Sequence, residues 1–434
     1  MSGPMLGITG ILVMFFILFV LRIPAAFTML LVGFVGIAKA TSLDAAFAMT
    51  GSELWTIFSN YGLTVIPLFI LVGEIVHYAG YNNSLYHASY RWFGHHRGGL
   101  AMTTILASAA FSAISGSNTA TAATMSAVAI PAMKEYKYHP LLNAGSVAAG
   151  ATLGVLIPPS IVLVVYGLYT GQSIGKLFFG NVIPSVILTT LILLTVVWIC
   201  RRHPDWGPSG PRSNWNERFA ALPEALDILL LFGIIMYALF TGVVTATEAA
   251  AVSCFLALVI CTLRRKLTWK KLGGALVDTL RISCMVFMIV AGAVIFAKFL
   301  TITRLPFETA AWISALDLPR WMVLWVILLC YILGGCIMDA LAFLLVSLPI
   351  FYPLVIELGY DPIWFGQVIT IVTTMGSIMP PIGICCYVVS GMSNIPLGTV
   401  FRSALYYIPS YVISIVVLMA SPYWTVLVLS NLVK

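Results

Sequence analysis

The chain has 434 residues, of which 61% are hydrophobic and only 9% are charged. A soluble core cannot hold so large an apolar fraction, whereas repeated uncharged runs of about 18 or more residues are typical of membrane-spanning helices. The net charge of +7 would suggest nucleic-acid binding in a soluble domain, but here Lys and Arg collect in cytoplasmic loops. Composition therefore predicts an all-α polytopic membrane protein in contact with lipid and without a nucleic-acid partner.

The first half of the chain, 1–201, contains five apolar segments that we interpret as membrane crossings. They are 5–21, 24–39, 61–80, 139–172 (broken) and 181–200. The first run lacks a basic leader and a cleavage site, so it is interpreted as a retained span. The mixed stretch 41–60 is either an interfacial helix or a plain loop.

A shorter apolar pair, 98–133, lies between the third and fourth crossings and is split at Ser115-Gly116-Ser117-Asn118. Each piece has about 15–17 residues, which is too short to span a bilayer comfortably. Non-helical backbone at membrane depth is tolerated only where protein surrounds it. We therefore expect a re-entrant hairpin here.

The second half, 225–434, follows a Pro- and Gly-rich segment, 202–224, which we interpret as a cytoplasmic linker. Its expected crossings are 225–242, 244–263, 282–302, 361–393 (broken) and 409–430, and 264–281 is a mixed stretch like 41–60. A second hairpin is expected at 321–355, split between Gly334 and Asp339. The helices in 1–95 and 225–320 would then form a scaffold around the hairpins and broken helices.

The two halves share their proline and glycine positions at a constant offset of 222 residues. Pro131, Pro140, Gly154, Pro158 and Pro159 correspond to Pro353, Pro362, Gly376, Pro380 and Pro381. In both copies Gly-x-x-x-Pro-Pro interrupts a long apolar stretch, which is typical of the broken helices that build transport sites. The alternative is that these are ordinary packing residues and kinks, which are frequent in membrane helices without any ion.

Loop charges indicate that the two halves are inverted. The segment 264–271 carries five basic residues, whereas its counterpart 42–49 carries none. Five crossings per half is an odd number, so the second half should have the opposite orientation. Most of the 22 Lys and Arg residues then fall on one side, which is the cytoplasm, and both termini lie outside. That side includes Arg22, Arg201, Arg202, Arg212, Arg218, Arg281 and Arg402.

The hairpin tips suggest cation chemistry. Around Ser115 the first tip is rich in hydroxyls and carries no charge, and oxygen dipoles of this kind suit sodium. Each broken helix frees carbonyls about one turn before its prolines, because proline offers no N–H. One tip plus one break predicts one sodium site, and the repeat predicts two. Ser117, Asn118, Thr119 and Asp339 are candidates for contacting the substrate.

Three acidic residues have open roles. Asp339 either caps the second hairpin helix or helps to hold a cation, and capping is the favoured interpretation. Glu74 and Glu248 are expected inside the membrane, where they could relay protons or satisfy a helix break. The eight cysteines are interpreted as small buried hydrophobes.

No enzyme is predicted. The match to a nucleophile elbow at 171–175 has no preceding strand, and no phosphate loop or metal-binding histidine motif is present. Without a nucleotide site, transport would be driven by an ion gradient.

Four segments resemble the large membrane subunit of tripartite ATP-independent periplasmic (TRAP) transporters, and the resemblance covers nearly the whole chain. They are Ser115 to Thr121, Gly154 to Ser160, Gly242 to Ala249 and Gly376 to Gly383. The resemblance implies an elevator mechanism in the bacterial inner membrane that carries sodium and an organic acid inward, such as a C4-dicarboxylate or a sialic acid. It also implies two partners, a separate small four-helix membrane subunit and a periplasmic binding protein.

By this resemblance the coupling sodium ions occupy two sets of residues. The first set is Ser112, Ser115, Gly154, Ile157 and Pro159, and the second is Gly334, Gly376, Met379 and Pro381. Two rival functions stay open, namely a stand-alone sodium or proton dicarboxylate symporter and a structural or channel subunit of a membrane complex.

Overall fold

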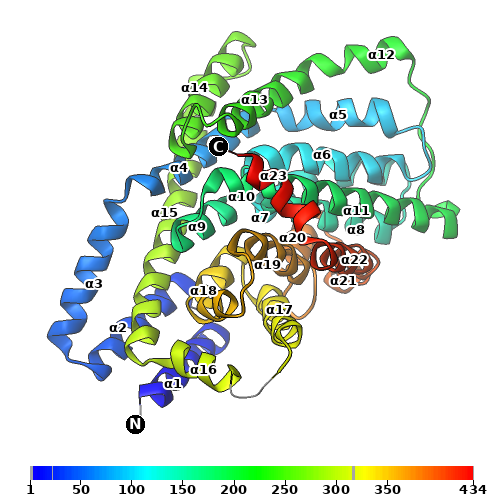
Figure 1. Cartoon of the computed structure of the whole chain (residues 1–434). Helices are drawn as coiled ribbons and strands as arrows, with labels where there is room; N and C mark the ends of the chain where they lie inside the picture. Colours follow the sequence, from blue (N-terminus) through cyan, green and yellow to red (C-terminus); the bar gives the residue numbers. More distant parts are fainter. Residues whose placement is uncertain (1–2, 22, 315–317, 434) are drawn as a thin grey trace.

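The computed structural model describes residues 3–21, 23–314 and 318–433, and within them every regular element is a helix (Figure 1). A chain this apolar has to satisfy its backbone groups internally, which helices do within one segment. The predicted all-α class is therefore confirmed. Arg22, one of the basic residues expected in the cytoplasm, lies outside the described residues.

Seven helices in the described part of the chain are long and apolar enough to cross a membrane, or eight if one bent pair counts as a single span. This is fewer than the five crossings per half expected from sequence. The shortfall arises because several apolar segments are short or interrupted. The helix Ala25–Ala40, for example, has only 16 residues.

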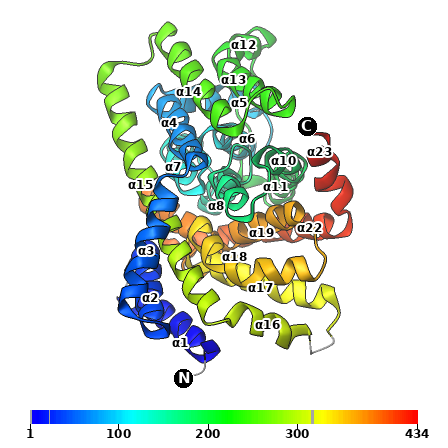
Figure 2. The same cartoon turned by 60° about the vertical axis from the view of Figure 1, so that its left-hand side comes forward.

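The N-terminal helices are joined by short turns. They are α1 (Gly3–Phe16, extended by a π turn to Leu21), α2 (Ala25–Ala40), α3 (Leu43–Phe58), α4 (Val65–Tyr78) and α5 (Tyr81–Phe93). The helices α2 and α4 both pack along α15 (Trp269–Ile302), so segments far apart in sequence lie side by side (Figure 2). Glu53 of α3 also forms an ion pair with Lys298 of α15 at 2.9 Å.

The second half begins with α13 (Leu222–Phe240) and α14 (Ala246–Leu263), and α16 (Leu305–Ser314) follows α15. The division of 264–302 into an interfacial stretch and a separate crossing is wrong, because α15 is one continuous helix of 34 residues. Its polar residues are accommodated by partners: Asp278 accepts a hydrogen bond from Tyr78 at 2.6 Å and lies 3.7 Å from Arg281.

Two helix pairs occupy the segments expected to form hairpins. The first is α6 (Gly99–Ser115) with α7 (Asn118–Glu135), and the second is α17 (Arg320–Ile337) with α18 (Ala340–Glu357). Each pair is joined by only two non-helical residues. The helices of the second pair have 18 residues each, slightly more than expected, and qualify by length and composition as spans.

Two helices are broken at the paired prolines. The first consists of α8 (Pro140–Thr152) and α9 (Ile161–Thr170), and the second of α19 (Pro362–Gly376) and α20 (Ile384–Ser393). The bonds Pro158–Pro159 and Pro380–Pro381 are cis. The halves interlock, since α9 packs against α18 and α20 packs against α7.

Five further helices are α10 (Ile174–Gly180), α11 (Val182–Arg202), α21 (Leu397–Leu405), α22 (Ile408–Ala420) and α23 (Val428–Leu432). The last predicted crossing, 409–430, is interrupted after Ala420.

The segment 202–224 is more ordered than a bare linker. It contains a 3₁₀ turn and a short helix, α12 (Trp215–Ala220). The ring of Trp206 stacks between His139 and His203, with ring centroids 4.4 Å and 4.3 Å away. The amide of Gly210 donates to the Gly94 carbonyl at 2.9 Å. The segment is therefore attached both to the start of α8 and to the end of α5.

Candidate functional site: hairpin tips against broken helices

The first tip is a compact group of hydroxyls. Ser115 Oγ lies 3.0 Å from Thr121 Oγ1, and Thr121 donates to the Ser117 carbonyl at 2.8 Å. Gly116 joins α6 to α7 with φ of 58°, a left-handed conformation that glycine adopts without strain. Ser112 is fully buried, and its hydroxyl donates to the carbonyl four residues earlier at 2.6 Å. That hydroxyl proton is engaged, so the oxygen of Ser112 can act only as an acceptor.

Asn118 carries an unpaired polar group at the first tip. Its side chain is 2% exposed, and Oδ1 accepts from the Thr119 amide at 2.9 Å. No described residue accepts a hydrogen bond from Nδ2. Ser117 Oγ caps α7 and lies 3.1 Å from Thr119 Oγ1. A buried donor without a partner costs about 1–3 kcal/mol, so Asn118 Nδ2 is suited to a ligand oxygen.

The first break presses directly against this tip. Gly154 contacts the backbone of Ser117 so closely that a Cβ on Gly154 would lie 2.6 Å from the Ser117 carbonyl carbon. On the other side of the tip, a Cβ on Gly116 would lie 3.0 Å from the Pro159 carbonyl oxygen. Pro158 stands four residues after Gly154 and has no N–H to donate to the Gly154 carbonyl. The fold therefore brings tip and break together, as the sequence predicted.

Not every carbonyl in the first break is free, because three residues that sequence reasoning missed are bonded to them. Ser160 Oγ donates to the Val155 carbonyl at 2.5 Å. Asn181 Nδ2 and Ser185 Oγ both donate to the Leu156 carbonyl. Ser160 stands directly before an apolar run, which is the pattern of a helix N-cap and could have identified it. Asn181 and Ser185 come from the next span and carry no comparable signal.

The second break meets its tip through backbone atoms. A Cβ on Gly376 would lie 2.6 Å from the Ile332 carbonyl oxygen and 2.7 Å from the Gly335 carbonyl carbon. The Cys336 carbonyl accepts hydrogen bonds from the amides of Ile382 and Gly383, at 3.2 and 3.0 Å. Sequence reasoning did not identify Cys336, Ile382 or Gly383 as parts of the site, because a hydrogen bond between backbone atoms does not depend on the identity of the side chain.

The predicted ligands of the second site differ from one another in hydrogen bonding and in exposure. The Gly334 carbonyl already accepts from Met338 at 2.8 Å, and the Gly376 carbonyl accepts from Met379 at 2.9 Å. Each carbonyl oxygen keeps a second lone pair. Pro381 is exposed, at the end of the break away from Gly376. Asp339 is the N-cap of α18 and accepts from the Leu341 amide at 3.1 Å, the geometry of a cap.

The other acids do not gather at the tips. Glu248 is exposed and forms a capping box at the start of α14, where it accepts from the Thr245 amide at 2.7 Å. The carboxylate of Glu248 therefore stabilises the start of α14. Glu74 is half-buried on α4. Among the described residues no group of three or more His, Cys, Asp or Glu side chains could hold a metal ion.

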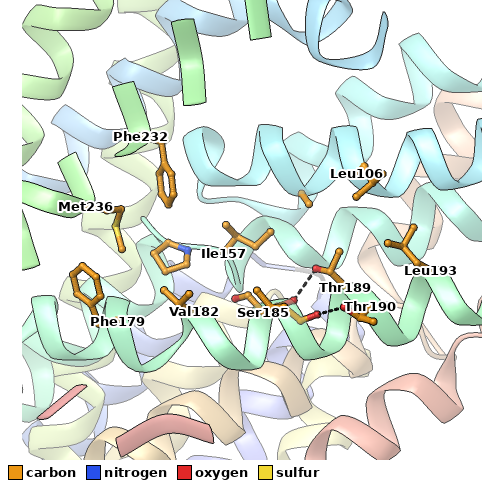
Figure 3. Close-up of a pocket in the computed structure, with 13 residues that line it drawn as sticks. Leu106, Ile157, Phe179, Val182, Ser185, Thr189, Thr190, Leu193, Phe232 and Met236 are labelled. Carbon is orange, nitrogen blue, oxygen red and sulfur yellow. Dashed lines mark hydrogen bonds between the residues drawn. The ribbon is translucent and has the colours of Figure 1, made fainter. Parts of the chain in front are cut away.

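A cavity of about 540 Å³ lies beside the first break (Figure 3). Ile157 and Pro158 line one wall, α11 another, and Phe232 and Met236 of α13 close it. Its three hydroxyl groups are all engaged. Two donate to carbonyls of α11, and that of Ser185 shares its one proton between the Asn181 carbonyl at 2.6 Å and the Leu156 carbonyl at 3.2 Å. The three hydroxyl groups belong to Ser185, Thr189 and Thr190. Without free polar groups the cavity does not suit a carboxylate.

These features define a polytopic helical membrane protein in which two helix-pair tips meet two proline-broken helices. The family model of the tripartite ATP-independent periplasmic transporter, DctM component, matches residues 12–424. The chain belongs to this family, so the resemblance seen in the sequence is confirmed.

Several curated relatives are similar over most of their length. The chain is 37% identical to the C4-dicarboxylate TRAP transporter large permease protein of Pseudomonas aeruginosa, over 81% of this chain and 82% of the relative. It is 31% identical to the sialic acid TRAP transporter large permease protein of Vibrio cholerae, over 88% and 89%. Among solved structures, the YdaH transporter of Alcanivorax borkumensis shares the fold, with a TM-score of 0.66 at 15% identity, over 90% of this chain and 91% of that one.

Proposed function

We propose that this chain performs sodium-coupled uptake of an organic acid across the bacterial inner membrane, as the large permease subunit of a binding-protein-dependent transporter. The observation that carries the proposal is the pairing of a tip with a break in both halves. Each pairing concentrates oxygen dipoles where two helices end, without an acid at the first tip and with Asp339 at the second, which is an arrangement suited to a monovalent cation.

Two sodium sites follow from this pairing. The first uses Ser112, Ser115, Gly154, Ile157 and Pro159, and the second uses Gly334, Gly376, Met379 and Pro381. Ligation in the second site depends more on backbone carbonyls, because its tip has no serine or threonine between Gly334 and Asp339. Neither set contains a carboxylate, so binding does not require a change of protonation.

The substrate contacts side chains projecting from the tips, which are Ser117, Asn118, Thr119 and Asp339. Asn118 supports an acidic substrate, because its buried Nδ2 has no acceptor among the described residues. A carboxylate oxygen would supply that acceptor, and the N-terminal end of α7 favours negative charge. The relatives are named for C4-dicarboxylate, sialic acid and 2,3-diketo-L-gulonate. An organic acid is therefore the substrate class proposed here.

An elevator movement is proposed for the body formed by the hairpins and broken helices. The surface between this body and α13 is apolar and includes the cavity beside Ile157, so few polar contacts would have to break as one surface slides past the other.

The proposed orientation places both termini outside, as the positive-inside rule suggests. The proposed partners are a small four-helix membrane subunit and a periplasmic binding protein. A relative from Oleidesulfovibrio alaskensis is named as an isethionate permease DctMQ, and this chain spans 64% of its length.

Reconstitution tests the proposal. The chain, its small subunit and its binding protein are placed in liposomes, and uptake of candidate acids is measured with and without an inward sodium gradient. Uptake should saturate and should require both sodium and the binding protein. Saturable uptake without the binding protein would support a stand-alone symporter instead, and non-saturable flux would support a channel.

A further inference from the structure

A group of aromatic and basic side chains lies where α5 ends and α12 begins; it is called the linker cluster here and comprises Arg91, Trp92, His95, Trp215, Arg218 and Phe219. The guanidinium of Arg218 lies 5.9 Å from the ring of Trp92 and 5.0 Å from that of Trp215. Phe219 packs edge-on against Trp92 at 6.0 Å. These contacts hold a cation on aromatic rings, which stabilises it without neutralising its charge.

Three polar nitrogens of the linker cluster are buried and lack hydrogen bonds within the described part of the chain. They are Trp92 Nε1, His95 Nδ1 and Arg218 Nε. Two of them can only donate, so they call for an acceptor oxygen. The acid beside them is already engaged, because Glu217 forms an ion pair with Arg91 at 3.0 Å. The guanidinium of Arg218 lies beside Trp92 and its charge acts on His95, so the three unmet groups share one neighbourhood, which favours a common external acceptor.

The electrostatic field at this point is positive. Partial burial lowers the pKa of His95, and the positive charges of His96, Arg218 and Arg212 lower it further. A neighbouring anion would be attracted by the same charges.

The position of the cluster indicates which anion it meets. In both views α12 lies at the end of the molecule away from the N-terminus, as does the basic turn between α14 and α15 (Figures 1 and 2). The side chains of Trp215 and Phe219 are 61% and 58% exposed. Exposed aromatic rings beside arginines are typical of the level of lipid headgroups. A soluble anion would leave these rings in water.

We propose that the linker cluster binds the phosphate headgroup of an anionic phospholipid from the cytoplasmic leaflet. The phosphate oxygens accept from the partly exposed guanidinium of Arg218. A small rotation of the side chains of Trp92 and His95, which are only partly buried, brings their unmet nitrogens to the same oxygens, and the acyl chains cover Trp215 and Phe219. The lipid thereby joins α12 to the end of α5.

Native mass spectrometry of the delipidated complex with its small subunit tests this proposal. Dioleoylphosphatidylglycerol is titrated in, with dioleoylphosphatidylcholine as a control of equal chain length. Arg218→Gln should weaken phosphatidylglycerol binding about tenfold or more, the loss of one charge-assisted hydrogen bond to the phosphate, which exceeds the general effect of one surface charge. Arg202→Gln is the matched control, because Arg202 also lies over a tryptophan, Trp198, at 5.6 Å but stands outside the linker cluster.

A second variant keeps the test decisive if Arg218→Gln fails to fold. Trp92→Phe preserves an aromatic ring and removes the unmet Nε1, so it should weaken phosphatidylglycerol binding by a smaller factor than Arg218→Gln, because it removes a hydrogen bond to the phosphate and no charge. Equal binding of the two lipids, or equal losses in Arg218→Gln and Arg202→Gln, would overturn the proposal. Displacement of the lipid by millimolar inorganic phosphate would assign the cluster to a free anion and would also overturn it.

Discussion

Replacing Gly154 by alanine tests the contact between the first tip and the first break. The new Cβ would lie 2.6 Å from the Ser117 carbonyl carbon and 2.8 Å from the Asn118 Cα, and both are backbone atoms that cannot rotate away. Carbon atoms in contact prefer about 3.5–4.0 Å, so the tip has to withdraw by roughly 1 Å. Overpacking of this kind costs about 1–3 kcal/mol. If the cost falls on the sodium-bound arrangement, half-saturation requires about 5- to 160-fold more sodium.

The assay is uptake by proteoliposomes over a sodium titration, together with thermal unfolding to separate a local effect from loss of the fold. Gly391→Ala is the matched control, because Gly391 lies within α20 and a Cβ there meets nothing within 4 Å. Alanine inside a helix is favoured over glycine by about 1 kcal/mol, so the control should keep its sodium dependence and should gain stability rather than lose it. An unchanged sodium titration in Gly154→Ala would refute the reasoning that the tip and the break share one ion site.

Three further outcomes are expected. Ser115→Ala and Asn118→Ala should raise the sodium or substrate concentration needed for half-maximal uptake, and normal values in both would remove the first tip from the site. Asp339→Asn should retain stability, because asparagine caps helices as well as aspartate, whereas Asp339→Ala should lose about 1 kcal/mol in thermal unfolding. Asp339→Asn should nevertheless change the substrate concentration needed for half-maximal uptake, because Asp339 is a proposed substrate contact; an unchanged value would leave Asp339 as a helix cap only. Trp206→Ala removes two stacked ring contacts, worth about 1–3 kcal/mol together, and should expose the linker to limited proteolysis. Protection equal to that of the unaltered chain would show that the stack does not hold the linker.

Much of the fold followed from local pattern. The breaks at Pro158 and Pro380 could be placed because proline removes an N–H wherever it occurs in a helix. The 34-residue helix α15 was divided wrongly, because Trp269 and its neighbouring lysines suggest an interface whether or not the helix continues. The hydroxyl of Tyr78, 200 residues away in the chain, is a partner for Asp278 within that helix, and no local pattern predicts such a partner.

Sequence analysis could predict those site residues whose type is informative by itself, and it could not predict those that act through backbone atoms or through an unspecific polar group. The hydroxyls around Ser115 and the glycine at 154 were identifiable because hydroxyl groups and glycine are informative residue types at membrane depth. The bonds that Asn181 and Ser185 make to the Leu156 carbonyl were not, since any polar residue in the next span could have served. The same holds for the Cys336 carbonyl, whose partners are backbone amides.

The sequence by itself determined that this is a helical membrane protein of the TRAP large-permease family, with two glycine- and proline-marked breaks and one hydroxyl-rich tip. These properties depend on composition and on residues close together in the chain. Only the tertiary structure decided which carbonyls in the first break are taken by side chains, that Gly154 and Gly376 each lie against a tip, and that the linker is attached at Trp206. Apart from the bond of Ser160 to the Val155 carbonyl and the stacking of Trp206 on His203, those contacts join residues far apart in sequence, and they depend on how helices pack rather than on what any single segment prefers.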